Sequence, residues 1–302
     1  MALLVAATLA AAACAGDTDD PGDTAADGSA REDPSVLGER AAPGDDPADP
    51  GGDLPALPAS ADDTAAVLSR VERALRSDGL TDEELSSAAH DQQVAYQALV
   101  GHPEWIDEVV ANVDGSVRAA VEANARAGLE LSRIGEGDAP DDLPDWVIVA
   151  PPPADELLGS YREAEERYRI GWQYLAAIHL VETRMSRIRG DSVAGAQGPM
   201  QFIPPTWETY GEGDVRDDRD AIIAAARYLA DRGGPGDMDA ALHAYNPTPH
   251  YVAAIRSYAE VMVEEPRAYR GYYDWRVYYG TSAGRYLLPE GYGAGEPAVA
   301  LD

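Results

Sequence analysis

One stretch of this chain constrains its fold and chemistry more than any other, residues 172–207, which read WQYLAAIHLVETRMSRIRGDSVAGAQGPMQFIPPTW. In its first half, Leu175, Ile178 and Glu182 follow at i, i+3 and i+7, so they share one face of an expected helix. A carboxylate in line with an apolar stripe loses hydration, which disfavours its charged form and raises its pKa. Such a group can stay protonated near neutral pH and act as a general acid, unless the glutamate simply ends the helix with its charge in water.

A glycine-punctuated loop follows the expected helix. Gly190, Gly195 and Gly198 are separated by small residues and precede the run Pro199-Met200-Gln201-Phe202. Glycines allow the backbone to adopt positive φ and to approach a ligand closely. The loop is therefore a candidate for one wall of a binding site beside Glu182.

The order of these residues resembles the lytic transglycosylases with a lysozyme-like catalytic domain, enzymes that cleave the glycan strands of peptidoglycan. The resemblance is carried by Glu182, by the run from Ser192 to Gln201 (Ser-x-x-Gly-Ala-x-Gly-x-Met-Gln) and by Ala244-Tyr245-Asn246. It extends from Trp172 to Met262, near a third of the chain. A lone glutamate is common, whereas these three blocks in this order are specific.

Three departures from the family pattern point to an actinobacterial branch rather than the best-known members. Thr183 stands where a serine usually follows the glutamate, and Pro199 stands where leucine is usual before Met200. The spacing from the glutamate to Gly195-Ala196 is also one residue longer. These differences leave the role of Glu182 in place and weaken the assignment of Ser192.

The resemblance implies a reaction with a single carboxylate, whereas most glycosidases use two. Glu182 would protonate the glycosidic oxygen between N-acetylmuramic acid and N-acetylglucosamine. The resulting carboxylate would then take the proton from the muramic 6-hydroxyl as that oxygen closes on C1, which leaves a 1,6-anhydro end. This reaction needs no metal and no cofactor, and its intramolecular attack depends mainly on positioning.

The resemblance also implies roles for five further residues. Gln201, Asn246 and Ser192 would hydrogen-bond the sugar or its N-acetyl group. Tyr245 would lie near Glu182 and the attacking oxygen, and Met200 would line the pocket. For Met200 and Tyr245, simple packing in the core is an equally good interpretation.

Two other functions stay open from the sequence. A lysozyme-like hydrolase would admit water and need a second carboxylate, for which Asp191 and Asp214 are candidates. A wall-binding or scaffold protein would bind glycan strands without cleaving them. The products released from peptidoglycan distinguish these functions, because an anhydro end is lighter than a hydrolysed end by one water.

Composition excludes several function classes. The net charge is −31 and every basic residue is arginine, which argues against a nucleic-acid partner. The one cysteine, Cys14, allows no disulfide framework. None of the five histidines has the spacing of a zinc site, and His179, three residues before Glu182, is expected to be structural.

The N-terminal residues resemble an export signal. Residues 1–14 are small and apolar and end at Cys14, as in a lipoprotein signal whose cysteine is lipidated, although no basic residue follows Met1. An alanine-rich helix with a chance cysteine is the alternative. Residues 15–63 contain many aspartates, glycines and prolines and predict a disordered acidic linker. We therefore expect an exported protein of the cell envelope, anchored at the membrane surface through the lipid.

The rest of the chain predicts a mainly α-helical fold. Residues 64–135 carry helical stripes and a capping box at Thr81 and Glu84, and form an expected accessory region. A linker at 136–154 precedes the expected lysozyme-like domain at 155–265. Residues 266–302 form an aromatic extension that either contacts glycan or covers the core. We expect the protein to be a monomer.

Overall fold

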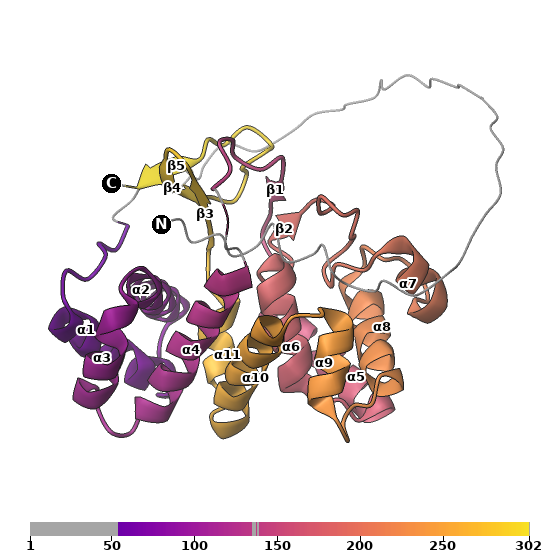
Figure 1. Ribbon diagram of the computed structural model, residues 1–302, viewed down its shortest axis with the longest axis horizontal. Helices are drawn as coiled ribbons and strands as arrows, with labels where there is room; N and C mark the ends of the chain where they lie inside the picture. The colour runs from indigo at the N-terminus through magenta and orange to yellow at the C-terminus, as the bar shows by residue number, and fades with distance from the viewer. Residues whose placement is uncertain (1–53, 135–136, 138, 302) are drawn as a thin grey trace.

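The computed structural model describes residues 54–134, 137 and 139–301 of the chain. These residues form eleven α-helices and five short strands, which confirms the mainly α-helical fold expected from the sequence (Figure 1). Cys14, the signal-like segment 1–14 and most of the acidic linker lie outside the described residues. Within the described residues, no helix combines the length and the apolar content required to cross a bilayer.

The first four helices build the N-terminal part of the helical body. They are α1 (Ala61–Leu75), α2 (Asp82–Gly101), α3 (Ile106–Asn112) and α4 (Arg118–Ile134). Helix α2 begins at the predicted capping box, because the Thr81 side chain accepts from the Glu84 amide and the Glu84 carboxylate accepts from the Thr81 amide. Helix α1 begins at Ala61, within residues expected to belong to the linker, because Ser60 caps it through the amide of Asp63.

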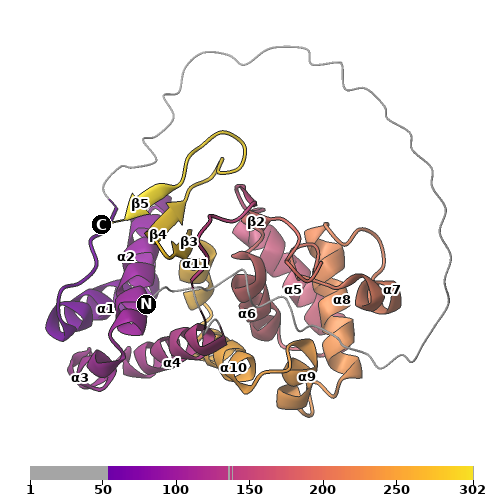
Figure 2. The ribbon, with the colours of Figure 1, turned by 45° about the horizontal axis from the view of Figure 1, so that its top comes forward.

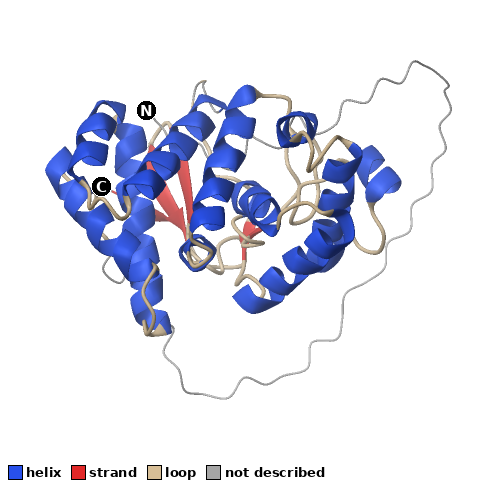
Figure 3. Cartoon of the chain, turned by 90° about the horizontal axis from the view of Figure 1, so that it is seen from below, coloured by secondary structure: helices blue, strands red, loops and turns tan. Residues whose placement is uncertain are grey.

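Seven helices follow, and among them α5, α8, α10 and α11 pack against α6 (Figure 2). Figure 3 shows that helices make up most of the molecule. Helix α6 is buried on almost every side, since only Gln173 and Tyr174 among its residues are not buried. It begins after Gly171 and ends at Arg184, which adopts the left-handed conformation with φ 54°. The seven helices are α5 (Ala154–Tyr168), α6 (Trp172–Thr183), α7 (Pro204–Tyr210), α8 (Asp218–Asp231), α9 (Met238–Tyr245), α10 (Pro249–Glu264) and α11 (Ala268–Tyr273).

One hydrophobic core joins the N-terminal helices to the later ones. The buried residues of this core run from Ala61 in α1 to Trp275 after α11. Helix α4 packs along α10, and the hydroxyl of Tyr272 on α11 donates to Oδ1 of Asn124 on α4 at 2.6 Å. The helices on both sides of the linker at 136–154 therefore share their apolar contacts.

Two small sheets lie on one side of the helical body (Figure 1). Strand β1 (Val147–Ile148) pairs antiparallel with β2 (Ile188–Arg189), and the C-terminal strands form an antiparallel sheet in the order β3-β4-β5. These three strands are β3 (Val277–Thr281), β4 (Gly284–Leu288) and β5 (Val299–Leu301). The sheets share a second hydrophobic cluster, made of Trp146, Ile148, Ile188, Val277, Tyr279 and Leu288.

The aromatic C-terminal extension contributes mainly to packing. Tyr269, Tyr272 and Trp275 are buried in the main core, and Tyr279 is buried in the second cluster. The C-terminal sheet was not predicted from the sequence. Its position beside β2 places Tyr279 close to the C-terminal end of α6.

Candidate active site

A cavity of about 260 Å³ opens where α6 ends and the glycine-rich loop begins. Three of the predicted site residues, Glu182, Ser192 and Gln201, line this cavity together. The other lining residues come from the end of α6, from the segment before β1, from β2 and its following loop, and from β3. They are Pro144, Asp145, Trp146, Thr183, Ile188, Gly190, Asp191, Val193 and Tyr279.

Glu182 lies in the last turn of α6 with only 6% of the residue exposed. The hydroxyl of Tyr251, on α10, donates a hydrogen bond to Oε1 of Glu182 at 2.8 Å. Burial raises the pKa of Glu182 from 4.5 to about 7, and the hydrogen bond from Tyr251 opposes this rise. Glu182 is therefore a carboxyl group that holds or releases a proton near neutral pH.

Thr183 ties the end of α6 to the loop. Its hydroxyl donates to the carbonyl oxygen of Pro199 at 2.7 Å and accepts from the amide of Ser186 at 3.3 Å. Threonine therefore supplies the hydroxyl that a serine would supply at this position in the family pattern. The contact fixes the distance between Glu182 and the turn that carries Gln201.

A tight turn places Gln201 at the cavity. Gln197 and Phe202 exchange two backbone hydrogen bonds of 2.9 Å, which close the turn at its base. Gly198 adopts φ +72°, and a Cβ there would lie 1.8 Å from the carbonyl oxygen of Val215, so no other residue fits. Gln201 itself has φ +51°, and its side-chain amide donates to the carbonyl oxygen of Gly198 at 2.9 Å.

Ser192 shapes the loop as well as lining the cavity. Its hydroxyl oxygen accepts from the amide of Ala196 at 3.0 Å, and its own amide donates to the carbonyl oxygen of Ala196 at 2.9 Å. The next residue, Val193, is fully exposed beside the cavity. The hydroxyl hydrogen of Ser192 is not used by the contact with Ala196.

Three predicted site residues do not line the cavity. Met200 is completely buried in the main core, and the hydroxyl of Tyr245 donates to its carbonyl oxygen at 2.5 Å. The Tyr245 ring stacks on Tyr251, with 6.3 Å between centroids and 3° between planes. Asn246 is the buried residue that ends α9. Tyr245 thus supports the tyrosine that contacts Glu182, while the sugar-binding roles of these three residues remain predictions.

His179 lies one helical turn before Glu182 and belongs to a buried polar network. Ser186 donates to Asp218, so its oxygen accepts from Nε2 of His179 at 2.6 Å. Nδ1 then accepts from the hydroxyl of Tyr161 at 2.7 Å. Burial and the nearby Arg189 lower the pKa of His179 to about 3, so the ring is neutral. This network holds α6 against α5 and α8.

The two aspartates considered as second carboxylates differ in position. Asp191 lines the cavity, is 44% exposed at its side chain and pairs with Arg216 at 3.2 Å. Asp214 does not line the cavity, and its carboxylate accepts from the backbone amide of Arg216 at 2.9 Å. Only Asp191 shares the cavity with Glu182.

Residues 159–260 match the family model described as the transglycosylase SLT domain. The chain carries a transglycosylase SLT domain. This domain extends from α5 into α10 and contains Glu182, the glycine-rich loop and the Tyr245-Asn246 pair, as the resemblance in the sequence implied.

One curated relative is the membrane-bound lytic murein transglycosylase F of Thiobacillus denitrificans. It is 26% identical over 204 residues, which cover 63% of this chain and 40% of the relative. The chain therefore matches less than half the length of that protein. No solved structure matches the chain.

Two aromatic residues of the cavity wall lie outside the SLT domain. Trp146 precedes β1 and Tyr279 lies in β3, and their rings meet edge to face with centroids 5.5 Å apart. Gly190 admits the Trp146 ring, because a Cβ at this position would approach Cδ1 of the indole to 3.0 Å. Neither this wall nor Tyr251 was predicted from the sequence. The hairpin that carries Tyr279 could have been predicted from the turn-like residues 282–284 (Ser-Ala-Gly), which separate two apolar and aromatic runs.

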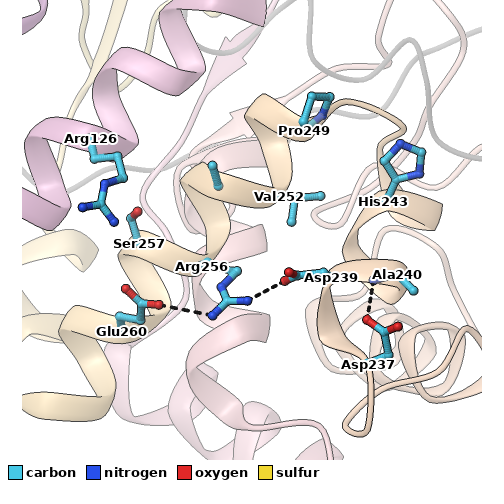
Figure 4. A pocket seen from close by; sticks show the side chains of 11 residues that line it. Arg126, Asp237, Asp239, Ala240, His243, Pro249, Val252, Arg256, Ser257 and Glu260 are labelled. Atoms are coloured by element: carbon cyan, nitrogen blue, oxygen red, sulfur yellow. Dashed lines mark hydrogen bonds and ion pairs between the residues drawn. The ribbon is translucent and has the colours of Figure 1, made fainter.

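A larger hollow of about 680 Å³ is lined by Arg126 of α4 and by residues on or beside α9 and α10 (Figure 4). The exposed Arg256 in this hollow is paired, with Asp239 at 2.7 Å and with Glu260 at 3.6 Å. The hollow contains none of the predicted site residues. The smaller cavity at Glu182 is therefore the candidate active site, because it alone of the two holds a buried group that titrates near neutral pH.

Proposed function

We propose that the protein is a lytic transglycosylase that cleaves the β-1,4 bond between N-acetylmuramic acid and N-acetylglucosamine in peptidoglycan. The observation that carries the proposal is the buried Glu182, whose pKa is raised to about 7 beside an open cavity. A general acid works best when its pKa lies near the operating pH. The SLT domain match and the name of the murein transglycosylase relative support the same substrate class.

In the proposed first step, protonated Glu182 donates its proton to the glycosidic oxygen. The bond from this oxygen to C1 of the muramic residue breaks, and positive charge develops at C1 and the ring oxygen. Glu182 is then a carboxylate, which the hydroxyl of Tyr251 stabilises through the 2.8 Å hydrogen bond. The nearby carboxylate also stabilises the developing positive charge.

In the second step, the 6-hydroxyl of the same muramic residue attacks C1. A bond forms between O6 and C1, and Glu182 takes the hydroxyl proton, which restores the acid. No water is consumed, and the product carries a 1,6-anhydro ring. Because the attacking group belongs to the substrate, the protein contributes mainly orientation and proton transfer.

Gln201 and Ser192 are the proposed contacts to the sugar or its N-acetyl group, since both line the cavity with Glu182. Asn246, Tyr245 and Met200 are proposed to shape the site from the adjoining layer. The stacking of Tyr245 on Tyr251 supports a positioning role for that tyrosine.

A lysozyme-like hydrolase is the second candidate, because Asp191 lines the same cavity as Glu182. Asp191 would activate a water, and its substitution by asparagine would stop cleavage. Mass spectrometry of the products from purified peptidoglycan separates the two reactions. Anhydro ends support the transglycosylase, whereas reducing ends that carry the extra water support the hydrolase.

The variant Glu182→Gln tests catalysis itself. We expect strand cleavage to be lost while binding to insoluble peptidoglycan persists, because glutamine keeps the shape of the side chain and lacks the acid. Persisting cleavage would show that Glu182 is not the acid. A wild-type protein that binds peptidoglycan and releases no fragments would instead be a wall-binding protein.

We also propose export to the cell envelope and anchoring through a lipid on Cys14. The name of the relative, a membrane-bound enzyme, supports the location. Labelling with a fatty acid analogue should mark the wild-type protein and fail to mark Cys14→Ala. A monomer is expected, and light scattering of the purified protein would test it.

A further inference from the structure

A third cavity, of about 40 Å³, lies between the N-terminal helices and the end of α6. Arg184, the residue that ends α6, lines it together with residues of α2, α4 and α10 and with Trp275. The cavity is separate from the one at Glu182, since the two share no lining residue.

Arg184 is a buried cation without a counter-charge among the described residues. It is 8% exposed, and no carboxylate lies within ion-pair distance of its guanidinium in the described ranges 54–134, 137 and 139–301. One nitrogen, Nη1, donates to the carbonyl oxygen of Leu180 at 2.9 Å, and the guanidinium carbon lies 5.9 Å from the centre of the Trp275 ring. A guanidinium has five N–H donors, so most of them are not accounted for by the Leu180 contact.

Burial of such a charge is costly unless it is paired. Burial indeed lowers the pKa of Arg184, and the neighbouring Arg187 lowers it further. The ring of Trp275 offsets part of this cost through its negative face. The surroundings of Arg184 thus favour an additional negative partner.

Among the side-chain amides of the described residues around the cavity, only that of Gln97 keeps both N–H donors free, because the Asn124 amide donates to Glu72 at 3.3 Å and to Tyr96 at 3.1 Å. The Tyr258 hydroxyl also lines the cavity. The side-chain amide of Gln93 is engaged by the backbone of Arg276, with two contacts of 2.8 Å. The oxygen of Gln97 accepts from Arg285, which leaves its N–H groups as the available part. The oxygen of Asn124 accepts from Tyr272 at 2.6 Å.

A buried carboxylate of the N-terminal helices, Glu72, is paired with residues other than Arg184. Glu72 is fully buried and pairs with Arg76. It also accepts from the hydroxyl of Tyr96 and from the amide of Gln92 at 3.0 Å. Its negative charge is therefore already compensated by its own partners.

From these contacts we propose that the cavity binds a small monovalent anion of about the size of chloride, held by the guanidinium of Arg184 and the amide of Gln97. A volume of about 40 Å³ suits this ligand. Roughly 10–15 Å³ holds one water, so the space suits a halide or a carboxylate as small as formate and is too small for a whole sugar, sugar acid or phosphate ester. The bound anion braces the end of α6, two residues after Glu182, against α2 and α4.

A chloride titration at constant ionic strength tests the proposal. Urea unfolding of the full chain is followed as sodium chloride replaces sodium gluconate. The gluconate anion is too large for the cavity. Once the site is saturated, each tenfold rise in chloride should increase the folding equilibrium constant about tenfold. The matched variants are Arg184→Met and, as control, Arg162→Met, which removes an exposed arginine of α5.

We expect the wild type and Arg162→Met to respond to chloride and Arg184→Met to show no response. No response in the wild type, or equal responses in all three proteins, would overturn the proposal and leave Trp275 and water as the partners of Arg184. If Arg184→Met does not fold, Gln97→Glu provides the second test, because it introduces a fixed carboxylate at the cavity. That variant should lose the chloride response and gain stability in gluconate, whereas a retained response would contradict the site.

Crystals soaked in sodium bromide give a direct readout of position. An anomalous peak beside Arg184 and Gln97 supports the site, and bromide only at the protein surface contradicts it. A parallel unfolding series in formate shows whether the site also takes a carboxylate. Stabilisation by formate assigns the site to both anions, and stabilisation by chloride alone assigns it to halides.

Discussion

The hydroxyl of Tyr251 donates a 2.8 Å hydrogen bond to Oε1 of Glu182, although the two residues are far apart in the chain. This bond favours the charged carboxylate, while burial favours the neutral acid. Burial is the larger effect, because the pKa of Glu182 is raised to about 7. The balance between these two contributions determines over which pH range the proposed acid carries its proton, and the first two predictions depend on it.

The first prediction concerns pH. If protonated Glu182 is the catalytic acid, kcat/KM for strand cleavage should fall as the pH rises through about 7. The measurement is the release of soluble fragments from purified peptidoglycan across a pH series. A rate that stays constant from well below to well above the pKa of Glu182 would contradict the assignment.

The second prediction concerns Tyr251→Phe. The substitution removes a hydrogen bond that lowers the pKa of Glu182, so this pKa should rise further and the alkaline limb of the pH profile should move to higher pH. Tyr210→Phe is the matched control, because the Tyr210 hydroxyl donates to Asp231 at the surface. Its profile should coincide with that of the wild type. An unmoved limb in Tyr251→Phe would mean that the contact does not influence the titrating group.

The third prediction concerns stability. The folded-state pKa of Glu182 lies above the ordinary value of 4.5, so between these values the folded protein binds more protons than the unfolded chain. Stability is therefore lost as the pH rises from about 4.5 to about 7 through this group, by roughly 3 kcal/mol in total.

Glu182→Gln removes this loss. The variant should exceed the wild type in free energy of unfolding by up to roughly 3 kcal/mol at about pH 8, and by much less at about pH 4. Urea unfolding at both pH values measures the difference. A variant that gains the same amount at both would show that the change comes from packing and not from proton binding.

The fourth prediction concerns Thr183. Thr183→Val removes the hydroxyl that binds the carbonyl oxygen of Pro199, leaves that buried oxygen without its donor, and should cost about 1–3 kcal/mol. Because this contact holds the loop of Gln201 against α6, kcat should fall as well. Thr183→Ser keeps the hydroxyl and serves as control, with activity close to that of the wild type. A loss in Thr183→Ser together with wild-type stability and activity in Thr183→Val would shift the role from the hydroxyl to the methyl group.

The sequence carried the information for several helix boundaries and for the burial of Glu182. The capping box of Thr81 and Glu84 depends on local hydrogen bonds alone, so it could be predicted and was confirmed. The apolar stripe of Leu175 and Ile178 likewise placed Glu182 on a buried face. Both are properties of neighbouring residues on one helix.

Contacts between distant segments could not be predicted in this way. Tyr251 reads as an ordinary apolar-face residue of α10, and nothing near it in the chain indicates that its hydroxyl meets Glu182. Trp146 and Tyr279 reach the cavity only because β1 and the C-terminal sheet pack together. The family pattern named Met200 as a pocket residue, yet a motif does not distinguish a side chain in the pocket from one in the layer behind it.

The core shared by α4 and α10 limits how this protein can be shortened. The SLT domain match begins at residue 159, but α10 rests on α4, and Tyr272 binds Asn124 across the same boundary. A fragment that starts at residue 159 would present that apolar face and those polar groups to water. A shortened enzyme for use on cell walls should therefore keep the chain from Ser60, the cap of α1, onward as one piece, since the helices before the SLT domain cover its apolar face.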